Sequence, residues 1–184
     1  SDLILPGHSG MHLCKLALKL TVEEVYEVQN SSTWKNYCSK KQEIAAHIRG
    51  RPDCPHAARI LPRSEILQSH LKHMILDTDG SNEVLLLHGT ANASIPGIVK
   101  QGFDARLSDY TLYGAGTYFT TDICKAVQYS NLKGANHANV CHGHFFIARV
   151  LLGHPYLAKG PMNTHKRPPM ADDYGVPHDS VVAT

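Results

Sequence analysis

The residues of this chain best suited to chemistry form a short series that begins with a histidine. His88 is followed by Gly89 and Thr90 and comes directly after the apolar run 83–87. A neutral imidazole both donates and accepts hydrogen bonds, and a glycine lets a ligand come close to the backbone. The series continues with Gly102-Phe103, then Gly114-Ala115-Gly116-Thr117-Tyr118-Phe119, then Tyr129. These residues alone leave two interpretations open: a ligand-binding site, or a strand-end histidine with two core tyrosines.

Several common enzyme classes have no motif in this sequence. It contains no G-x-x-x-x-G-K-[ST] loop, no complete G-x-G-x-x-G, no G-x-S-x-G and no H-E-x-x-H. These patterns mark nucleotide-phosphate binding, dinucleotide binding, a nucleophilic serine and a zinc protease site, respectively. Phosphotransferases, dehydrogenases and the common hydrolases therefore lose support.

Length, composition and charge indicate one ordinary domain over residues 1–184. The chain is 42% hydrophobic and carries a formal net charge of +2. This length can bury a full core without disulfides. Proteins that bind nucleic acid or an anionic membrane usually carry a basic stripe or a much larger positive charge, so this charge indicates neither partner and excludes neither.

The cysteines predict reduced thiols. They are odd in number, scattered and without a C-x-x-C pair: Cys14, Cys38, Cys54, Cys124 and Cys141. We therefore expect an intracellular location, in the cytoplasm or the nucleus. No run of about 18 apolar residues is present, and residues 1–20 are interrupted by histidines and lysines, unlike a signal peptide.

Periodicity predicts alternating helices and strands. A helix from Ser31 to just before Gly50 is expected, with Ser31 or Ser32 as its N-cap. Its buried face would carry Trp34, Tyr37, Cys38, Ile44 and Ile48. Further helices are expected over 64–76, over 94–101 with Ile95, Ile98 and Val99 inward, and over 123–129 with Thr121 or Asp122 as cap. Strands are expected over 83–87, 145–152 and 179–183, with 130–144 and 153–179 irregular and the class of 22–28 left open.

The ordered series resembles the catalytic domain of the poly(ADP-ribose) polymerase (PARP) family, the diphtheria-toxin-like ADP-ribosyltransferases. The resemblance spans about residues 22–184. It also includes Val28-Gln29-Asn30, Trp34, Tyr37, Asn82-Glu83, Ala148 to Gly153 and Asp179-Ser180-Val181-Val182. Arg167-Pro168-Pro169 followed by Asp179-Ser180-Val181 is most similar to the mono(ADP-ribosyl)transferase branch.

This resemblance implies an α+β fold and a reaction. The fold would be a mixed, split β-sheet with flanking helices and an NAD cleft, needing one or two strands beyond Val182. The reaction would transfer ADP-ribose from NAD to a protein acceptor, with NAD as substrate and nicotinamide released. Because a glycosidic bond breaks through an oxocarbenium-like transition state, the site must hold nicotinamide and ribose and stabilise positive charge.

The resemblance also implies roles for individual residues. His88 would bind an NAD ribose hydroxyl, Gly89 would pair with the nicotinamide amide, and Thr90 would lie at the donor site. Tyr118 and Tyr129 would form aromatic walls around nicotinamide, with His88 and Tyr118 as members of the family's His-Tyr-Glu triad. Asp104, Arg106 and Tyr110 would contact adenosine, or else are surface residues without a role.

Two features qualify these expectations. Ala126 stands where the family often has a small hydroxyl residue that binds the carboxamide, which implies weaker nicotinamide anchoring. The third triad residue would follow Thr184; a glutamate there accompanies polymer formation and a hydrophobic residue accompanies single transfer. A catalytically silent module that binds NAD or a protein partner is therefore the alternative.

A metal site is the less favoured expectation. A short segment lies where tankyrases carry a zinc-binding loop, and it holds His137, Cys141, His142 and His144. Cysteine and histidine suit zinc, but the spacing differs and one cysteine is present, so zinc is not expected.

Overall fold

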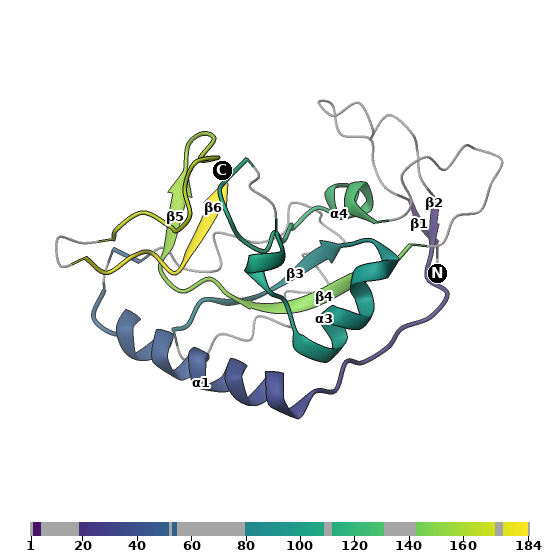
Figure 1. The fold of residues 1–184 in the computed structure, drawn as a ribbon, viewed down its shortest axis with the longest axis horizontal. Helices are drawn as coiled ribbons and strands as arrows, with labels where there is room; N and C mark the ends of the chain where they lie inside the picture. The colour runs from purple at the N-terminus through teal and green to yellow at the C-terminus, as the bar shows by residue number, and fades with distance from the viewer. Residues whose placement is uncertain are drawn as a thin grey trace.

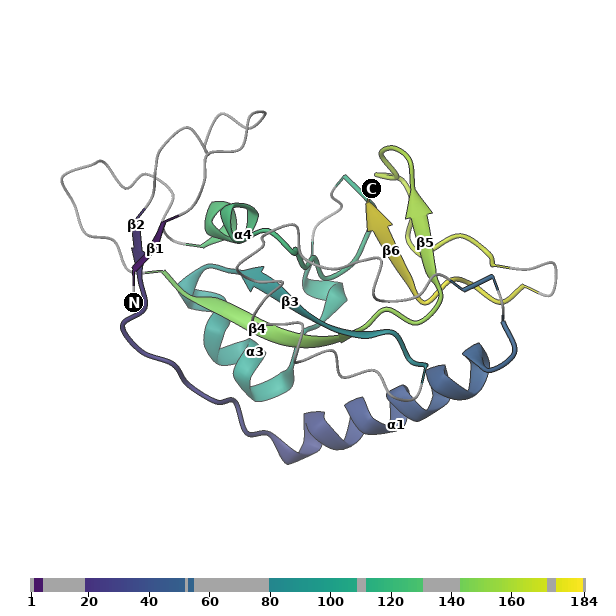
Figure 2. The ribbon, with the colours of Figure 1, turned by 180° about the vertical axis from the view of Figure 1, so that it is seen from behind.

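The computed structural model describes residues 2–4, 19–51, 53–54, 80–108, 112–130, 143–171 and 175–183. Its centre is an antiparallel pair of strands, β3 (Glu83–Gly89) and β4 (Phe145–Leu151). In both ribbon views, helix α1 (Ser31–Ile48) runs below this pair and helix α4 (Ile123–Tyr129) lies above it (Figures 1 and 2). Helices thus flank small sheets, consistent with the α+β expectation.

Strand β3 is the most enclosed element of the described structure. Its register with β4 runs from Glu83 opposite Leu151 to Gly89 opposite Phe145. On its other edge, Leu87 exchanges two backbone hydrogen bonds of 2.9 Å with Thr120. A cluster of buried residues spans the pair: Val84, Leu86 and Leu152, with Phe119, Val150 and Val182 packed against it. This enclosure explains why the strand is a continuous apolar run rather than an alternating one.

Helix α1 begins at Ser31 as expected, but its N-cap is Asn30 rather than Ser31 or Ser32. The Asn30 side-chain oxygen accepts from the Thr33 amide at 3.1 Å. Its Nδ2 donates to the carbonyls of Val99 at 3.2 Å and Lys100 at 2.8 Å. These carbonyls belong to the last turn of α3 (Ile95–Gln101). One amide therefore caps two helix ends, which a serine hydroxyl is too short to do.

The buried face of α1 is partly polar, which the apolar pattern did not predict. Ile44 is buried as expected, but Trp34 is 49% exposed and lies under the Arg149 guanidinium at 5.0 Å. Trp34 also stacks on Tyr37, with ring centroids 5.5 Å apart. The expectation of a core tryptophan is therefore wrong, because the ring gains a cationic partner on β4 instead.

Glu83 joins α1 to both strands. Its carboxylate is fully buried and accepts from Tyr37 Oη at 2.6 Å, Lys41 Nζ at 2.6 Å and Arg149 Nε. Burial raises the pKa of Glu83, but the hydrogen bonds from Arg149, Lys41 and Tyr37 outweigh it and leave that pKa below its ordinary value. The carboxylate is thus held ionised inside the domain.

The shorter helices follow the sequence closely. The turn η3 (Asn92–Ser94) leads into α3, which ends at Gly102, and η4 (Ala105–Leu107) follows Asp104. Helix α4 begins after Asp122, whose carbonyl accepts from Ala126 N at 3.1 Å. Val99 is 38% exposed, so its expected inward position is wrong.

The outer strands were harder to predict. Strand β5 (Pro155–Ala158) pairs in parallel with β6 (Ser180–Ala183), and β1 (Asp2–Ile4) pairs with β2 (Lys19–Thr21). The β6 strand was expected, whereas β5 lies in a segment expected to be irregular. A four-residue strand beginning with proline has no readable period, and its partner lies more than twenty residues away. Residues 22–30 form no regular element, and the helix expected over 64–76 lies outside the described residues.

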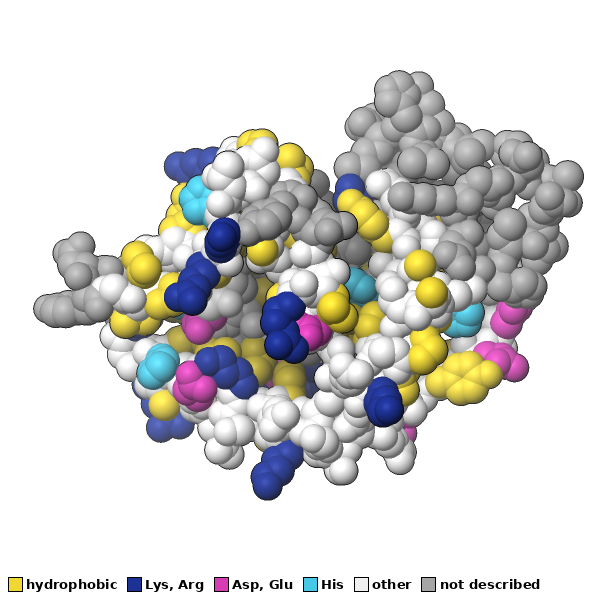
Figure 3. Space-filling view, in the orientation of Figure 1, with side chains coloured by type: hydrophobic (Ala, Val, Ile, Leu, Met, Phe, Trp, Pro, Cys, Tyr) yellow, Lys and Arg dark blue, Asp and Glu magenta, His cyan; other side chains and the backbone are white. Residues whose placement is uncertain are grey.

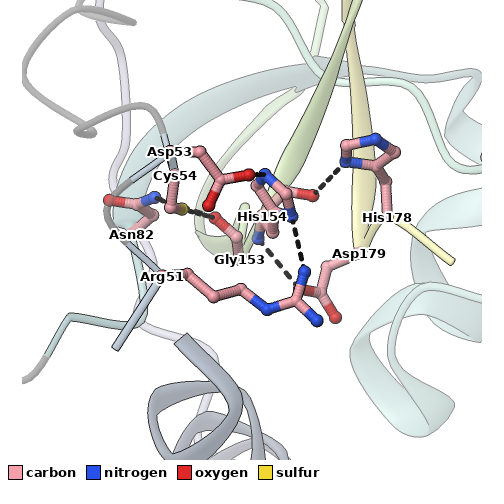
Figure 4. Close-up of polar contacts among 8 residues, drawn as sticks. All are labelled: Arg51, Asp53, Cys54, Asn82, Gly153, His154, His178 and Asp179. Carbon is pink, nitrogen blue, oxygen red and sulfur yellow. Dashed lines mark hydrogen bonds and ion pairs between the residues drawn. The ribbon is translucent and has the colours of Figure 1, made fainter. Parts of the chain in front are cut away.

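A polar cluster, which we call the His154 junction, joins the end of α1 to the strands (Figure 4). The Asp179 carboxylate accepts from the His154 amide at 2.8 Å, and the Asp179 amide donates back to His154 O at 3.0 Å. Gly153 has φ +59°, and a Cβ there would lie 2.6 Å from Asp179 Cγ. The turn from β4 to β5 therefore requires glycine. The junction comprises Arg51, Asp53, Cys54, Asn82, Gly153, His154, His178 and Asp179.

No helix in the described ranges combines the length and the hydropathy needed to span a bilayer.

Candidate active site at the end of β3

His88 and Tyr118, which lie thirty residues apart in the sequence, are in direct contact. His88 Nδ1 lies 2.7 Å from the carbonyl oxygen of Tyr118. A carbonyl only accepts, so Nδ1 carries a hydrogen, and in the neutral form of the ring Nε2 is then an acceptor. This assignment follows from the hydrogen-bond partner. The structure therefore brings together the two residues expected to be catalytic.

Three phenylalanines gather around the His88 imidazole. Phe103 meets it edge-on with ring centroids 4.9 Å apart, while Phe119 lies at 5.5 Å and Phe146 at 6.4 Å. Phe103 also contacts both of the other phenylalanines, at 5.0 and 5.6 Å. Phe103 and Phe119 belong to the motifs that the sequence displays. Phe146 is not part of those motifs, and only its register position opposite His88 assigns it to this cluster.

Gly89 faces the backbone of helix α4. A Cβ at Gly89 would overlap the carbonyl oxygen of Ala126 and lie 2.7 Å from its carbonyl carbon. Ala126 is only 1% exposed, so there is little room for either segment to move. The helix therefore supplies a structural reason for this glycine in addition to the expected ligand.

The Tyr118 hydroxyl is bound to its own loop. It donates to the Gly114 carbonyl at 2.7 Å and accepts from the Tyr113 amide at 3.0 Å. The hydroxyl is therefore committed to backbone groups, while the ring remains 37% exposed. Such a ring offers a fixed face on which a planar group can stack.

Tyr129 lies three residues after Ala126, at the end of α4. Residues three apart share a helix face, so Tyr129 lies on the same face of α4 as Ala126, which packs against Gly89. Its ring is exposed and lies 5.4 Å from the Lys125 ammonium. Thr90 follows the strand directly and is half-buried.

Asp104 and Arg106 pair with one another. Arg106 Nε and Nη2 lie 2.9 and 2.7 Å from the Asp104 carboxylate, and the Arg106 amide also donates to it at 2.9 Å. The hydrogen bonds from the Arg106 side chain and amide lower the pKa of Asp104 to about 2. Asp104 follows Phe103, so the pair begins beside the ring cluster. Tyr110, the third residue expected to contact adenosine, lies outside the described residues.

Of the four residues considered for a zinc site, only His144 lies within the described residues. His144 Nδ1 lies 2.9 Å from Asn92 Oδ1, so that nitrogen has a protein partner. His137, Cys141 and His142 lie outside the described residues. In the part of the chain that the structure covers, no three histidine, cysteine, aspartate or glutamate side chains are grouped to hold a metal ion.

With this geometry established, the comparison with known families can be stated. The sequence profile of the poly(ADP-ribose) polymerase catalytic domain matches residues 8–176. The match covers most of the chain and includes every residue assigned above to the end of β3. This chain therefore belongs to the poly(ADP-ribose) polymerase catalytic domain family and, through it, to the NAD-dependent ADP-ribosyltransferases.

Proposed function

We propose that this chain transfers single ADP-ribose units from NAD to a protein side chain at the end of β3. The observation that carries the proposal is the contact between His88 Nδ1 and the Tyr118 carbonyl, beside Gly89 and α4. In a family whose members use NAD, this contact ties an imidazole to the backbone of a tyrosine that is 37% exposed.

The proposed reaction breaks the bond between C1′ of the ribose and the nicotinamide nitrogen. The electron pair leaves with nicotinamide, which becomes neutral, while positive charge develops on the ribose. The acceptor side chain then forms a bond to C1′ and releases a proton. The protein's contribution is to hold the donor in place and to favour the developing cation.

Four residues would hold the donor. His88 Nε2 accepts a hydrogen bond from a ribose hydroxyl, and the backbone N–H and C=O of Gly89 pair with the carboxamide. Tyr118 and Tyr129 enclose the nicotinamide ring. Since the methyl group of Ala126 makes no hydrogen bond, the carboxamide depends on Gly89, and we expect comparatively weak NAD binding.

Transfer of single units is supported by the sequence after β5. Arg167-Pro168-Pro169 and Asp179-Ser180-Val181 are the motifs similar to the mono-transferase branch. They lie close together, because the His178 amide donates to the Pro169 carbonyl at 2.9 Å and Met170 bridges Pro177. A protein acceptor is supported by the net charge of +2 and by basic side chains scattered over the face in Figure 3.

An intracellular location belongs to the same proposal. It is supported by Cys38, which has a free thiol in the structure. Reduced thiols are usual in the cytoplasm and nucleus.

The test is to incubate the gene-encoded protein that carries this chain with labelled NAD. We expect label on protein, equimolar release of nicotinamide, and one ADP-ribose per modified site after enzymatic digestion. His88→Ala should remove most of the signal. Polymeric product contradicts single transfer, and the absence of both labelled protein and nicotinamide contradicts the enzymatic proposal. In that case, calorimetric NAD binding would identify a silent NAD-binding module.

A further inference from the structure

We propose that Phe103 is the positioning residue for His88, holding its imidazole so that Nδ1–H donates to the Tyr118 carbonyl and Nε2 accepts from the NAD ribose. This inference rests on the proposed function and adds to it the residue that sets the orientation of the donor-binding imidazole.

The first step is that the Tyr118 carbonyl selects one form of the ring. A neutral imidazole carries its hydrogen on Nδ1 or on Nε2, and only the Nδ1–H form can donate to a carbonyl. The separation of 2.7 Å is that of a well-formed hydrogen bond. The bond fixes the tautomer only while Nδ1 of the ring points at the Tyr118 carbonyl oxygen.

The second step is that Phe103 restricts rotation of the ring. Its plane is inclined 70° to the His88 plane, with the centroids 4.9 Å apart, which is an edge-to-face contact. Phe103 is itself held edge-on by Phe119 at 75° and by Phe146 at 81°. A phenyl ring held from two sides cannot easily follow a turning imidazole.

The third step is that the backbone of Phe103 is fixed on both sides. The preceding Gly102 amide donates to the Ile98 carbonyl at 2.8 Å and ends α3. The following Asp104 side chain accepts from the Arg106 amide at 2.9 Å and caps η4. Asn30 holds the last turn of α3 from α1. The backbone of Phe103 is therefore held in place, so that its side chain can fix the orientation of the His88 ring.

The decisive experiment is nuclear magnetic resonance of the imidazole carbons and nitrogens in histidine-labelled protein, in alkaline buffer where imidazoles are neutral. His88 should be the Nδ1–H tautomer in the unmodified protein. Phe103→Leu keeps the apolar volume but loses the ring, so a substantial fraction of the Nε2–H tautomer should appear. Phe103→Tyr, which keeps the ring, should restore the single tautomer.

Steady-state kinetics supply the second readout. Loss of one neutral hydrogen bond that is made equally to bound substrate and transition state should raise the KM for NAD about three- to tenfold in Phe103→Leu, with kcat little changed. The matched control is Phe145→Leu, the same change one residue before Phe146 on β4. Because successive strand residues point to opposite faces, it should leave the tautomer and the KM unchanged.

Each outcome bears on the proposal. An Nε2–H tautomer in the unmodified protein overturns it, and so does a Phe103→Leu protein with the original tautomer and KM. If Phe103→Leu does not fold, judged by its thermal unfolding, Phe103→Met replaces it because an unbranched side chain fills gaps more easily. If the protein neither binds nor consumes NAD, the proposed function fails, whereas the tautomer comparison still decides the role of Phe103.

Discussion

The carbonyl oxygen of Ala126 occupies the space that a side chain at Gly89 would need. Strand β3 and helix α4 therefore meet backbone to backbone at the candidate site. The consequence is that a change at either residue alters both the position of α4 and the surface at this end of β3.

Gly89→Ala should destabilise the domain by about 1–3 kcal/mol, because the new methyl group would overlap the Ala126 carbonyl. A backbone carbonyl cannot move away by changing rotamer, as a side chain can. Urea unfolding measures the loss. Gly97→Ala is the control, since a Cβ there meets nothing within 4 Å and alanine favours the interior of α3. Equal stability of Gly89→Ala and the unchanged protein would show that α4 does not pack as described.

Glu83→Gln should cost about 3 kcal/mol of unfolding free energy. The substitution keeps the shape but leaves Lys41 and Arg149 without the buried carboxylate that binds them. Guanidinium unfolding at neutral pH gives the value. Glu43→Gln is the matched control: Glu43 pairs with Lys40 in solvent, so its loss should change stability little. A small effect of Glu83→Gln would mean that α1 is held mainly by apolar packing.

Asn30 should show two separable contributions. Asn30→Ser keeps an N-cap oxygen for α1 but loses the donors to the Val99 and Lys100 carbonyls, whereas Asn30→Ala loses both. We expect Asn30→Ala to lose about 1–2 kcal/mol and Asn30→Ser to lie between it and the original protein. Thermal unfolding of the three proteins orders them. Identical values for Asn30→Ser and the original would contradict the link to α3.

His154 should make stability depend on pH below about 6.5, the ordinary imidazole value. The His154 residue is 6% exposed. Arg51 Nη1 lies 3.3 Å from its Nδ1, Asp53 Oδ2 lies 3.8 Å from its Nε2, and the centroid of the His178 ring lies 4.5 Å from that of its own ring. Burial, and then the neighbouring His178, lower the pKa of His154. Arginine only donates, so Nδ1 accepts and the ring is neutral.

The sign follows from proton binding. Because the folded pKa of His154 is depressed, the unfolded chain takes up its proton first as pH falls below about 6.5. The stability present above that pH is therefore lost progressively down to the folded pKa. Unfolding midpoints between pH 8 and pH 5 should show the decline, and His154→Asn should flatten it. His47→Asn, at an exposed position of α1, should leave the decline as it was.

Much of the local structure could be predicted because it depends on neighbouring residues. The apolar run before His88, the stop at Gly102 and the helical spacing from Ile123 each specify an element without distant help. Strand β5 could not be predicted, since its four residues beginning with Pro155 form a strand only by pairing with β6. Trp34 departs from its apolar pattern for the same reason, as Arg149 comes from another strand.

The sequence by itself determined the helices α1, α3 and α4 and the strands β3, β4 and β6, and its resemblance to a family predicted that His88 and Tyr118 share one site. Only the tertiary structure decided that Nδ1 of His88 donates to a backbone carbonyl, that Phe103 and Phe146 share its surroundings, and that Gly89 makes room for α4. The physical reason is that spacing encodes contacts within a turn or a strand. Contacts between segments far apart in the chain are instead set by how whole elements pack.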